Sequence, residues 1–242
     1  TEVLDAQAGF ALCPSPVYKG GLIDWSSAHL HPLKLALGLG QAAEARGAKL
    51  HPSSEVTGWE KQGGRHWLRT AGGATVSADR VILASNGFTR EGLHSDFDRR
   101  MMPVLSNIIV TRPLTQEELA AQAWQTDNPI CNTRNLLFYF RMLPGKRFMI
   151  GARGDLTGTP ADGDRMRQWL TRRMGEVFPA WRDVEVTHFW RGLVCMSMKF
   201  TPSVGRLEDD PSVFFGYGYH ANGVNTAPWS GRLLANMVAG CA

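Results

Sequence analysis

The sequence predicts a fold of the α/β to α+β class, and three stretches carry this prediction. Residues 213–238 form an apolar run, a glycine-rich turn and a run of small residues, which is typical of a buried strand followed by a helix. Residues 80–87 form an apolar run ending in small residues, which indicates a strand buried on both faces of a parallel sheet. Strands and helices over residues 102–198 do not alternate regularly, and this favours a mixed or antiparallel sheet faced by helices.

Composition and charge narrow the class of protein. A chain of 242 residues can bury a core as one large domain or two small ones, and 43% hydrophobic with 20% charged residues is ordinary for a globular protein. The net charge is +4, but Lys and Arg are scattered and form no long basic run, so we expect no nucleic-acid partner. No apolar run approaches the roughly 20 residues of a membrane span, and no signal peptide opens the chain.

The four cysteines indicate the compartment. Cys13, Cys131, Cys195 and Cys241 lie far apart and include no C-x-x-C pair, so the sequence predicts neither a disulfide framework nor a zinc site. We therefore expect a cytoplasmic protein without a bound metal.

The N-terminal part is expected to contain a connector and a long helix. Residues 1–19 show weak periodicity and are interpreted as a connector. Pro32 suits the first turn of a helix and Gly47 suits a helix end, so we expect a helix over residues 33–46. Because apolar residues occur nearly all round this helix, we expect it to be largely buried.

Short strands are expected to follow this helix. Alternating apolar and polar residues, separated by glycine-rich turns, predict strands over residues 48–51, 55–60, 65–70 and 74–77, ahead of the strand at 80–87.

The middle of the chain is expected to form a sheet and two helices. Thr115-Gln116-Glu117-Glu118 is a capping box that predicts a short helix. Asp162-Gly163-Asp164 is expected to open a second helix, over residues 165–177. The predicted strands, with a Pro144-Gly145 hairpin turn between the second and third, cover residues 102–111, 136–143, 147–151, 184–190 and 193–198.

The turn after the C-terminal strand is the first candidate binding site. A strand, a glycine turn and a helix bring backbone N–H groups and a helix N-terminus close to a bulky ligand. The turn side chains suit a planar ligand with hydrogen-bonding edges, and they are Tyr217, Tyr219, His220, Asn222 and Asn225. The alternative is that the glycines serve only tight packing.

Several motifs resemble those of the D-amino-acid oxidase-like family of FAD-dependent oxidoreductases. Within it, the gamma-glutamylputrescine oxidoreductase branch is most similar in Gly21-Leu22-Ile23-Asp24, His29-Leu30-His31-Pro32-Leu33, Trp190-Arg191-Gly192 and Pro202-Ser203-Val204-Gly205-Arg206. The resemblance covers residues 18–239. A family member usually has glycine and histidine where this chain has Ala221 and Asn222, so the catalytic detail of this turn stays open.

The resemblance implies a domain arrangement. It predicts part of an FAD-binding, glutathione-reductase-like domain in two segments, residues 1–90 and 195–242, with a substrate domain inserted at residues 91–194. The GxGxxG fingerprint that opens a full-length member is absent from this chain. We therefore expect a fragment that lacks the N-terminal FAD-domain portion, holds FAD poorly or not at all, and is inactive alone. An unfinished sheet edge would favour self-association.

The same resemblance implies the residues that lie near FAD. Val56 corresponds to a valine beside the adenine, and the residues implied near the diphosphate and ribose are Ala84, Ser85, Asn86 and Gly87. The alternative is that they form only sheet core and turn. In the C-terminal turn the implied cofactor-binding residues are Gly218, Tyr219, Asn222, Gly223, Val224 and Asn225.

Five side chains are candidates for catalysis or substrate binding: His29, His31, Tyr139, Arg141 and His220. Tyr139 and Arg141 alternate on one strand face, and in the amino-acid oxidases a tyrosine and an arginine on such a strand hold the substrate carboxylate. The alternative for Arg141 is a surface salt bridge. His29 and His31 either cap the following helix or face the flavin or substrate. His220 is a candidate hydrogen-bond partner of the flavin N1–C2=O edge.

Cys195 has two interpretations. The segment Arg191-Gly192-Leu193-Val194-Cys195-Met196 resembles that of monomeric sarcosine oxidases, whose cysteine bonds covalently to the flavin. The gamma-glutamylputrescine enzymes have no cysteine there, and a buried cysteine also serves as a small apolar side chain.

The function implied by the resemblance is oxidation of the C–N bond of a small-molecule amine or amino acid. It proceeds by hydride transfer to N5 of FAD and hydrolysis of the resulting imine. The alternative is a non-catalytic, ligand- or partner-binding fragment without its dinucleotide-binding half.

Overall fold

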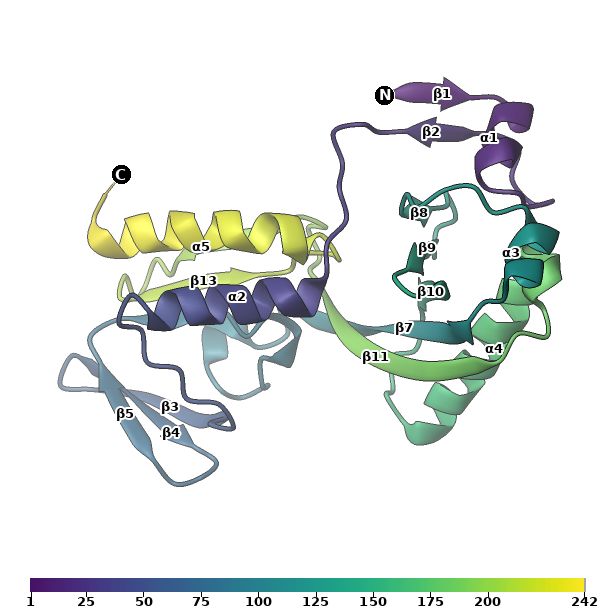
Figure 1. Ribbon diagram of the computed structural model, residues 1–242. Coiled ribbons are helices and arrows are strands. Elements are labelled where there is room, and N and C mark those ends of the chain that lie inside the picture. The colour runs from purple at the N-terminus through teal and green to yellow at the C-terminus, as the bar shows by residue number, and fades with distance from the viewer. Residues whose placement is uncertain (242) are drawn as a thin grey trace. The chain divides into compact units, whose positions relative to one another are not determined.

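The computed structural model describes residues 1–241 and divides the chain into two compact units (Figure 1). Unit 1 comprises Thr1–Leu30 and Leu105–Gly192, and unit 2 comprises His31–Val104 and the residues from Leu193 on. Each unit has its own sheets and its own apolar core, and each is described separately. The division into residues 1–90, 91–194 and 195–242 stays a prediction.

Unit 1 is built on a five-stranded sheet with the order β11-β7-β10-β9-β8. β10 pairs antiparallel with both β7 and β9, and β8 pairs antiparallel with β9. The predicted mixed or antiparallel sheet and its β9–β10 hairpin are therefore confirmed. The strands are β7 (Met102–Pro113), β8 (Ile130–Cys131), β9 (Phe138–Leu143), β10 (Arg147–Arg153) and β11 (Val186–Met196).

The short helix α3 (Gln116–Gln122) begins with the predicted capping box. The N–H of Glu118 donates to the Thr115 hydroxyl, and the N–H of Thr115 donates to the Glu118 carboxylate. The Arg112 guanidinium donates two hydrogen bonds to the same carboxylate and, with the Thr115 N–H, holds the Glu118 pKa at about 2. Local chemistry within four residues was enough to predict this helix start.

Unit 1 corrects three predictions. Residues 1–19 are not a connector: β1 (Glu2–Leu4) pairs with β2 (Gly21–Ile23), and α1 (Ala6–Leu12) lies between them. The helix expected at 165–177 is α4 (Pro160–Val177), which starts earlier because the Thr159 hydroxyl caps it.

The two strands predicted at 184–190 and 193–198 are the third correction. They form one continuous strand, β11, that passes through Gly192. A Cβ at position 192 would meet no atom within 4 Å, and the φ of Gly192 is not positive. The glycine therefore does not end the strand.

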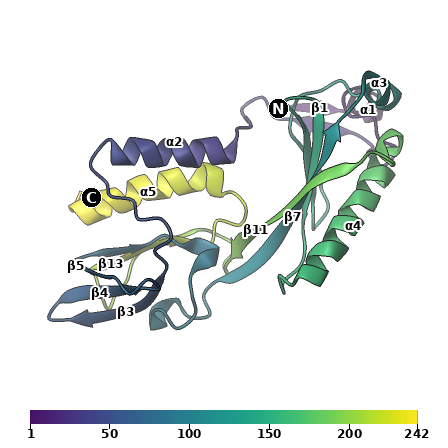
Figure 2. The ribbon, with the colours of Figure 1, turned by 60° about the horizontal axis from the view of Figure 1, so that its bottom comes forward.

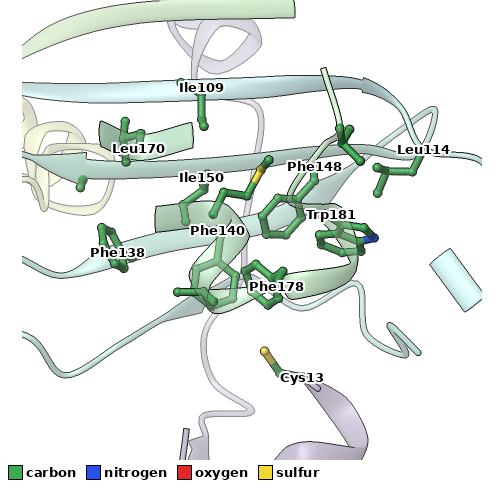
Figure 3. Packing of buried hydrophobic residues seen from close by; sticks show 14 residues of the cluster. Cys13, Ile109, Leu114, Phe138, Phe140, Phe148, Ile150, Leu170, Phe178 and Trp181 are labelled. Carbon is green, nitrogen blue, oxygen red and sulfur yellow. The ribbon is translucent and has the colours of Figure 1, made fainter. Parts of the chain in front are cut away.

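The core of unit 1 is a cluster of aromatic rings (Figure 3). The ring of Phe148 lies 5.0 Å from that of Phe178 and 4.7 Å from that of Trp181, centroid to centroid. Phe138 and Phe140 point into this core from β9, so Tyr139 and Arg141 lie on the opposite sheet face, as alternation predicted. The short turn η3 (Pro179–Trp181) and α4 supply the other wall of the core.

Unit 2 contains two three-stranded sheets and two helices (Figure 2). In the first sheet, with the order β12-β13-β6, β13 pairs antiparallel with β12 and parallel with β6. The strands are β12 (Ser203–Arg206), β13 (Val213–Tyr217) and β6 (Val81–Leu83). The second sheet is an antiparallel meander of β3 (Val56–Gln62), β4 (Arg65–Thr70) and β5 (Thr75–Ala78).

The helices of unit 2 are α2 (Pro32–Glu44) and α5 (Gly223–Ala239), with the short turns η1 (Asn86–Phe88) and η2 (Ser95–Phe97). The predicted helix and its N-terminal Pro32 are confirmed. Its expected burial is wrong: α2 has no buried residue, and Leu33 is 61% exposed, because no other described segment covers it. Across residues 1–241, no helix combines the length and apolar character needed to cross a membrane.

Two strand predictions in unit 2 also need correction. Residues 48–51 form no strand, because the N–H of Ala48 turns back to the carbonyl of Ala43 at the end of α2. The strand predicted at 80–87 is only β6, and its Ile82 is 44% exposed. Among the described residues, β6 pairs only with β13, so its outer edge is open.

A buried histidine joins the two sheets of unit 2. The Nδ1 of His66, on β4, accepts a hydrogen bond from Trp59 Nε1 at 3.1 Å, and its Nε2 lies 2.8 Å from Ser212 Oγ. The carboxylate of Asp210 binds both Ser212 and Lys61. Because Nδ1 is an acceptor here, His66 must be neutral with its proton on Nε2.

We expect this histidine to make unit 2 less stable in mild acid. Burial lowers the His66 pKa below its ordinary value, outweighing Asp210, which raises it; Lys61 and His94 also lower it. Below about pH 6.5, His66 is therefore protonated in the unfolded chain but still neutral in the folded chain. The free energy of unfolding falls as the pH falls towards the pKa of His66 in the folded chain. Between pH 7 and 5 the melting temperature should therefore drop more in the parent than in His66→Phe. His51→Gln, at an exposed histidine, is the control and should follow the parent.

Candidate functional site

The first part of the candidate site lies in unit 2, where β6 and β13 end side by side. These strands are parallel, so their carboxyl ends meet at one edge of the sheet. Asn86 lies three residues after the end of β6, and Gly218 directly follows β13. The N–H of Gly218 donates to Asn86 Oδ1 at 3.0 Å. This bond joins two predicted site residues that lie 132 positions apart in the sequence.

The turn after β13 is tightly bent. Gly218, His220 and Ala221 all have positive φ, of 74°, 51° and 74°, which is uncommon for residues other than glycine. The hydroxyl of Tyr219 lies back against Gly216, where a Cβ would be only 2.8 Å from it. The turn is therefore held in a specific, strained shape just before α5.

The N-terminus of α5 faces the same turn. Its first turn contains no acidic residue, and the N-cap Asn222 makes no side-chain capping bond. The first N–H groups of a helix, here those of Gly223 and Val224, have no acceptor within the helix. The N–H of Asn225 bonds the Asn222 carbonyl. Together with the helix dipole, these free donors suit an anionic or hydrogen-bonding ligand.

His220 points back into unit 2. Its Nε2 lies 3.2 Å from Ser197 Oγ, its ring lies 5.8 Å from that of Phe200, and its backbone N–H donates to the Cys195 carbonyl. Its predicted bond to a ligand stays a prediction.

Cys195 is buried at the end of β11. Burial raises the pKa of its thiol, partly opposed by the N–H of Gly218. A neutral, enclosed thiol is a poor nucleophile. These features favour the packing interpretation of Cys195 over covalent attachment.

The remaining predicted residues of unit 2 have mainly structural partners. A Cβ on Gly87 would lie 3.3 Å from Leu193 Cβ, so this glycine lets β11 approach η1. Ser85 Oγ lies 2.9 Å from Thr89 Oγ1, and Ala84 is exposed. Val56 begins β3 and pairs with Thr70. The structure thus brings Ser85–Gly87, Cys195 and the 218–225 turn together at one end of the β12-β13-β6 sheet. Val56 is not part of this group, because it lies on the β3-β4-β5 sheet.

The second part of the candidate site lies on the sheet of unit 1. Tyr139 and Arg141 project from β9 on the face opposite the aromatic core. The Tyr139 hydroxyl bonds Ser106 Oγ at 2.7 Å, and burial raises the Tyr139 pKa. Arg141 Nη2 donates to the Leu30 carbonyl at 3.3 Å, and its buried Nε has no hydrogen-bond partner among residues 1–241. The Leu30 carbonyl is not a charged partner, and Nε is buried, so these two observations do not support the alternative of a surface salt bridge for Arg141.

The two candidate histidines differ in structure. His31 is the N-cap of α2, and its Nδ1 accepts from the N–H of Lys34 at 3.4 Å, as the capping interpretation predicted. His29 is exposed and precedes the boundary between the units. A ligand-facing role stays a prediction for both.

Sequence reasoning missed three residues on the Tyr139 face: Ser106 on β7, and Gly151 and Arg153 on β10. Alternation along the predicted 147–151 strand could have placed Gly151 on this face. The pairing of Ser106 with Arg153 depends on strand register, which the sequence does not show.

Comparison with known proteins identifies relatives of the whole chain. The family model described as FAD dependent oxidoreductase matches residues 1–237. The probable oxidoreductase OrdL of Haemophilus influenzae is 32% identical over 229 residues, which cover 93% of this chain and 51% of that protein. The gamma-glutamylputrescine oxidoreductase of Escherichia coli is 30% identical over 241 residues, covering 100% of this chain and 55% of that protein. The chain thus spans about half the length of the curated relatives it matches.

Solved structures show the same fold. The crystal structure of glycine oxidase from Geobacillus kaustophilus matches with a TM-score of 0.82 at 23% identity, over 100% of this chain and 63% of that one. The chain therefore has a mixed α/β fold with several antiparallel sheets, as in this oxidase.

Proposed function

The chain belongs to the family of FAD-dependent oxidoreductases, and from this premise we propose that it serves in oxidising the C–N bond of an amine or amino acid. The match of the family model to residues 1–237 is the observation that carries the proposal. Relatives named gamma-glutamylputrescine oxidoreductase, glycine oxidase and D-amino acid dehydrogenase support amines and amino acids as the substrate class.

We propose that unit 2 contributes to an FAD-binding, glutathione-reductase-like domain, and that residues 91–194 form the inserted substrate domain. The parallel pair β6–β13 has an open outer edge at β6 among the described residues. A dinucleotide-binding segment outside these 242 residues would complete the sheet and supply the phosphate-binding turn.

The residues at the strand ends of unit 2 fit FAD. Asn86 and Gly218 bring two backbone turns together, and the acid-free start of α5 offers the N–H groups of Gly223 and Val224 to a polar ring edge or a phosphate. When bound, FAD would supply the redox chemistry, as the two-electron acceptor for oxidation of the amine C–N bond, and hydrolysis of the oxidised amine would give a carbonyl compound and an amine or ammonia.

Tyr139 and Arg141 are proposed to bind the substrate in unit 1. A phenol hydroxyl and a guanidinium on one strand face can hold a carboxylate, which fixes the amino carbon for hydride transfer. His220 is proposed to bond the flavin N1–C2=O edge, and one of His29 and His31 is proposed to face the flavin or the substrate. The residues of this chain would bind and orient the substrate and exclude water from it. The oxidation does not require a strong base.

The test is flavin reduction by an amine without oxygen. The chain is purified alone and also together with the proposed dinucleotide-binding segment, a combination called the completed protein. FAD is added to each, and glycine and gamma-glutamylputrescine are tried as reductants. We expect flavin bands only in the completed protein, and bleaching of those bands by an amine. A completed protein that holds FAD but is bleached by no amine or amino acid would refute the substrate class, and one that holds no FAD would refute the cofactor.

Acid precipitation of the FAD-loaded protein is expected to release the flavin into the supernatant. Cys195 is buried and its thiol pKa is raised, so little thiolate exists to form a bond to the ring. Absorbance of pellet and supernatant measures the outcome. Cys195→Ala should behave as the parent does, whereas a yellow pellet in the parent alone would establish Cys195 as a covalent ligand.

A further inference from the structure

The side chain of Tyr139 lies across a neighbouring strand. In the sheet of unit 1, β10 runs between β9 and β7. Tyr139 on β9 is paired with Gly151 on β10. Its hydroxyl nevertheless bonds Ser106 Oγ on β7, at 2.7 Å. The ring therefore spans β10 and reaches the second strand along.

Gly151 makes this crossing possible. A Cβ at position 151 would lie nearer than 3.0 Å to three atoms of the Tyr139 side chain, Cζ, Oη and Cε2. The backbone of Gly151 does not have a positive φ, so its conformation would suit other residues. Space for the tyrosine ring is therefore the reason that this position needs glycine.

Ser106 determines where the hydroxyl ends. Ser106 pairs with Arg153 across β7 and β10, and residues directly opposite each other in an antiparallel pair share a face. The Tyr139 hydroxyl is thus brought beside an arginine. When the Ser106 hydroxyl donates to Tyr139 Oη, the phenol proton is left to donate to a ligand.

We propose that Gly151 and Ser106 are positioning residues, which hold the Tyr139 ring across β10 and set its hydroxyl beside Arg153 to bind the carboxylate of the substrate. The inference rests on the proposed function, because it assigns Tyr139 to substrate binding. It adds the two residues that hold this side chain in place and a second arginine, Arg153, beside its hydroxyl.

The position of Tyr139 is tested by NMR of the chain with labelled tyrosine rings. The chain has four tyrosines, and the resonance missing in Tyr139→Phe identifies the relevant one. In Gly151→Ala and Ser106→Ala this resonance should move, whereas Ser106→Thr keeps a hydroxyl and should restore it. The Tyr139 pKa should rise further in Ser106→Ala, because the Ser106 hydrogen bond lowers it in the parent. Gly192→Ala is the matched control, since that strand glycine faces open space.

The substrate role is tested on the same samples by adding acetate, with chloride at equal ionic strength as the reference. Acetate should shift the Tyr139 resonance in the parent, in Ser106→Thr and in Gly192→Ala. In Ser106→Ala and Gly151→Ala its affinity should be about tenfold weaker, the effect of one lost hydrogen bond to a charged group.

The outcomes separate the two claims. An unchanged Tyr139 resonance and pKa in Ser106→Ala would overturn the positioning role, even if the completed enzyme oxidises amines. If the resonance moves as expected but acetate has no effect, the positioning stands and the carboxylate-binding role is overturned. If Gly151→Ala does not fold, Ser106→Ala, which adds no atoms, decides both questions.

Discussion

Replacing Trp181 by alanine is expected to lower the free energy of unfolding of unit 1 by about 3–5 kcal/mol. Trp181 is 0% exposed, and its ring centroid lies 4.7 Å from that of Phe148 and 5.3 Å from that of Phe178. Its indole N–H also donates to the Glu118 carbonyl at 3.0 Å, which ties η3 to α3. The substitution therefore leaves a large cavity and removes the hydrogen bond.

Urea unfolding followed by circular dichroism measures this loss. Because a domain is stable by only about 5–15 kcal/mol, Trp181→Ala should lower the midpoint steeply. Trp181→Phe keeps most of the ring but not the N–H, and should cost less. Trp25→Ala is the control, since Trp25 is 68% exposed and its replacement should change stability by less than about 0.5 kcal/mol. Equal midpoints for Trp181→Ala and Trp25→Ala would contradict the assignment of the core.

Features set by residues close in sequence could be predicted from it. The capping box at Thr115 depends on groups three residues apart, and the β9–β10 hairpin depends on the Pro144-Gly145 turn. The alternation of Phe138 and Tyr139 on β9 follows from the pleat of a strand. In each case the neighbours that decide the structure are adjacent in the chain.

Features that depend on distant partners could not be predicted in the same way. The apolar residues of α2 predict that the helix is buried, but they do not show which segment would bury it. Among the described residues no segment does, and α2 is exposed. Gly192 looked like a break between two strands, yet β11 runs without interruption from Val186 to Met196. The short β6 likewise depends on its single partner, β13.

The candidate site shows the same limit. Resemblance to a family pointed to Asn86 and Gly218 separately, but not to the hydrogen bond between them. Alternation placed Tyr139 on a face, but its contact with Ser106 needs the order of three strands and their register. The sequence could therefore predict candidate site residues, but the fold was needed to show which of them are in contact.

Asn86→Ala is expected to weaken FAD binding by the completed protein about 30-fold, which corresponds to about 2 kcal/mol. Two losses contribute. Asn86 has φ of 48°, a left-handed conformation that asparagine tolerates and that costs alanine about 1 kcal/mol. Alanine also lacks the acceptor for the Gly218 N–H, a hydrogen bond that contributes about 1 kcal/mol. The two turns at the strand ends would then separate, and flavin fluorescence titration measures the result.

Two further variants at position 86 separate these causes. Asn86→Gly keeps the left-handed backbone but loses the acceptor, so about half of the free-energy loss should remain. Asn86→Asp keeps the acceptor and adds a negative charge, which should weaken binding of an anionic cofactor more at low salt than at high salt. If all three variants bind FAD as the parent does, the Asn86–Gly218 bond is not needed to shape the cofactor site, and the strand ends of β6 and β13 lose their place in the proposal.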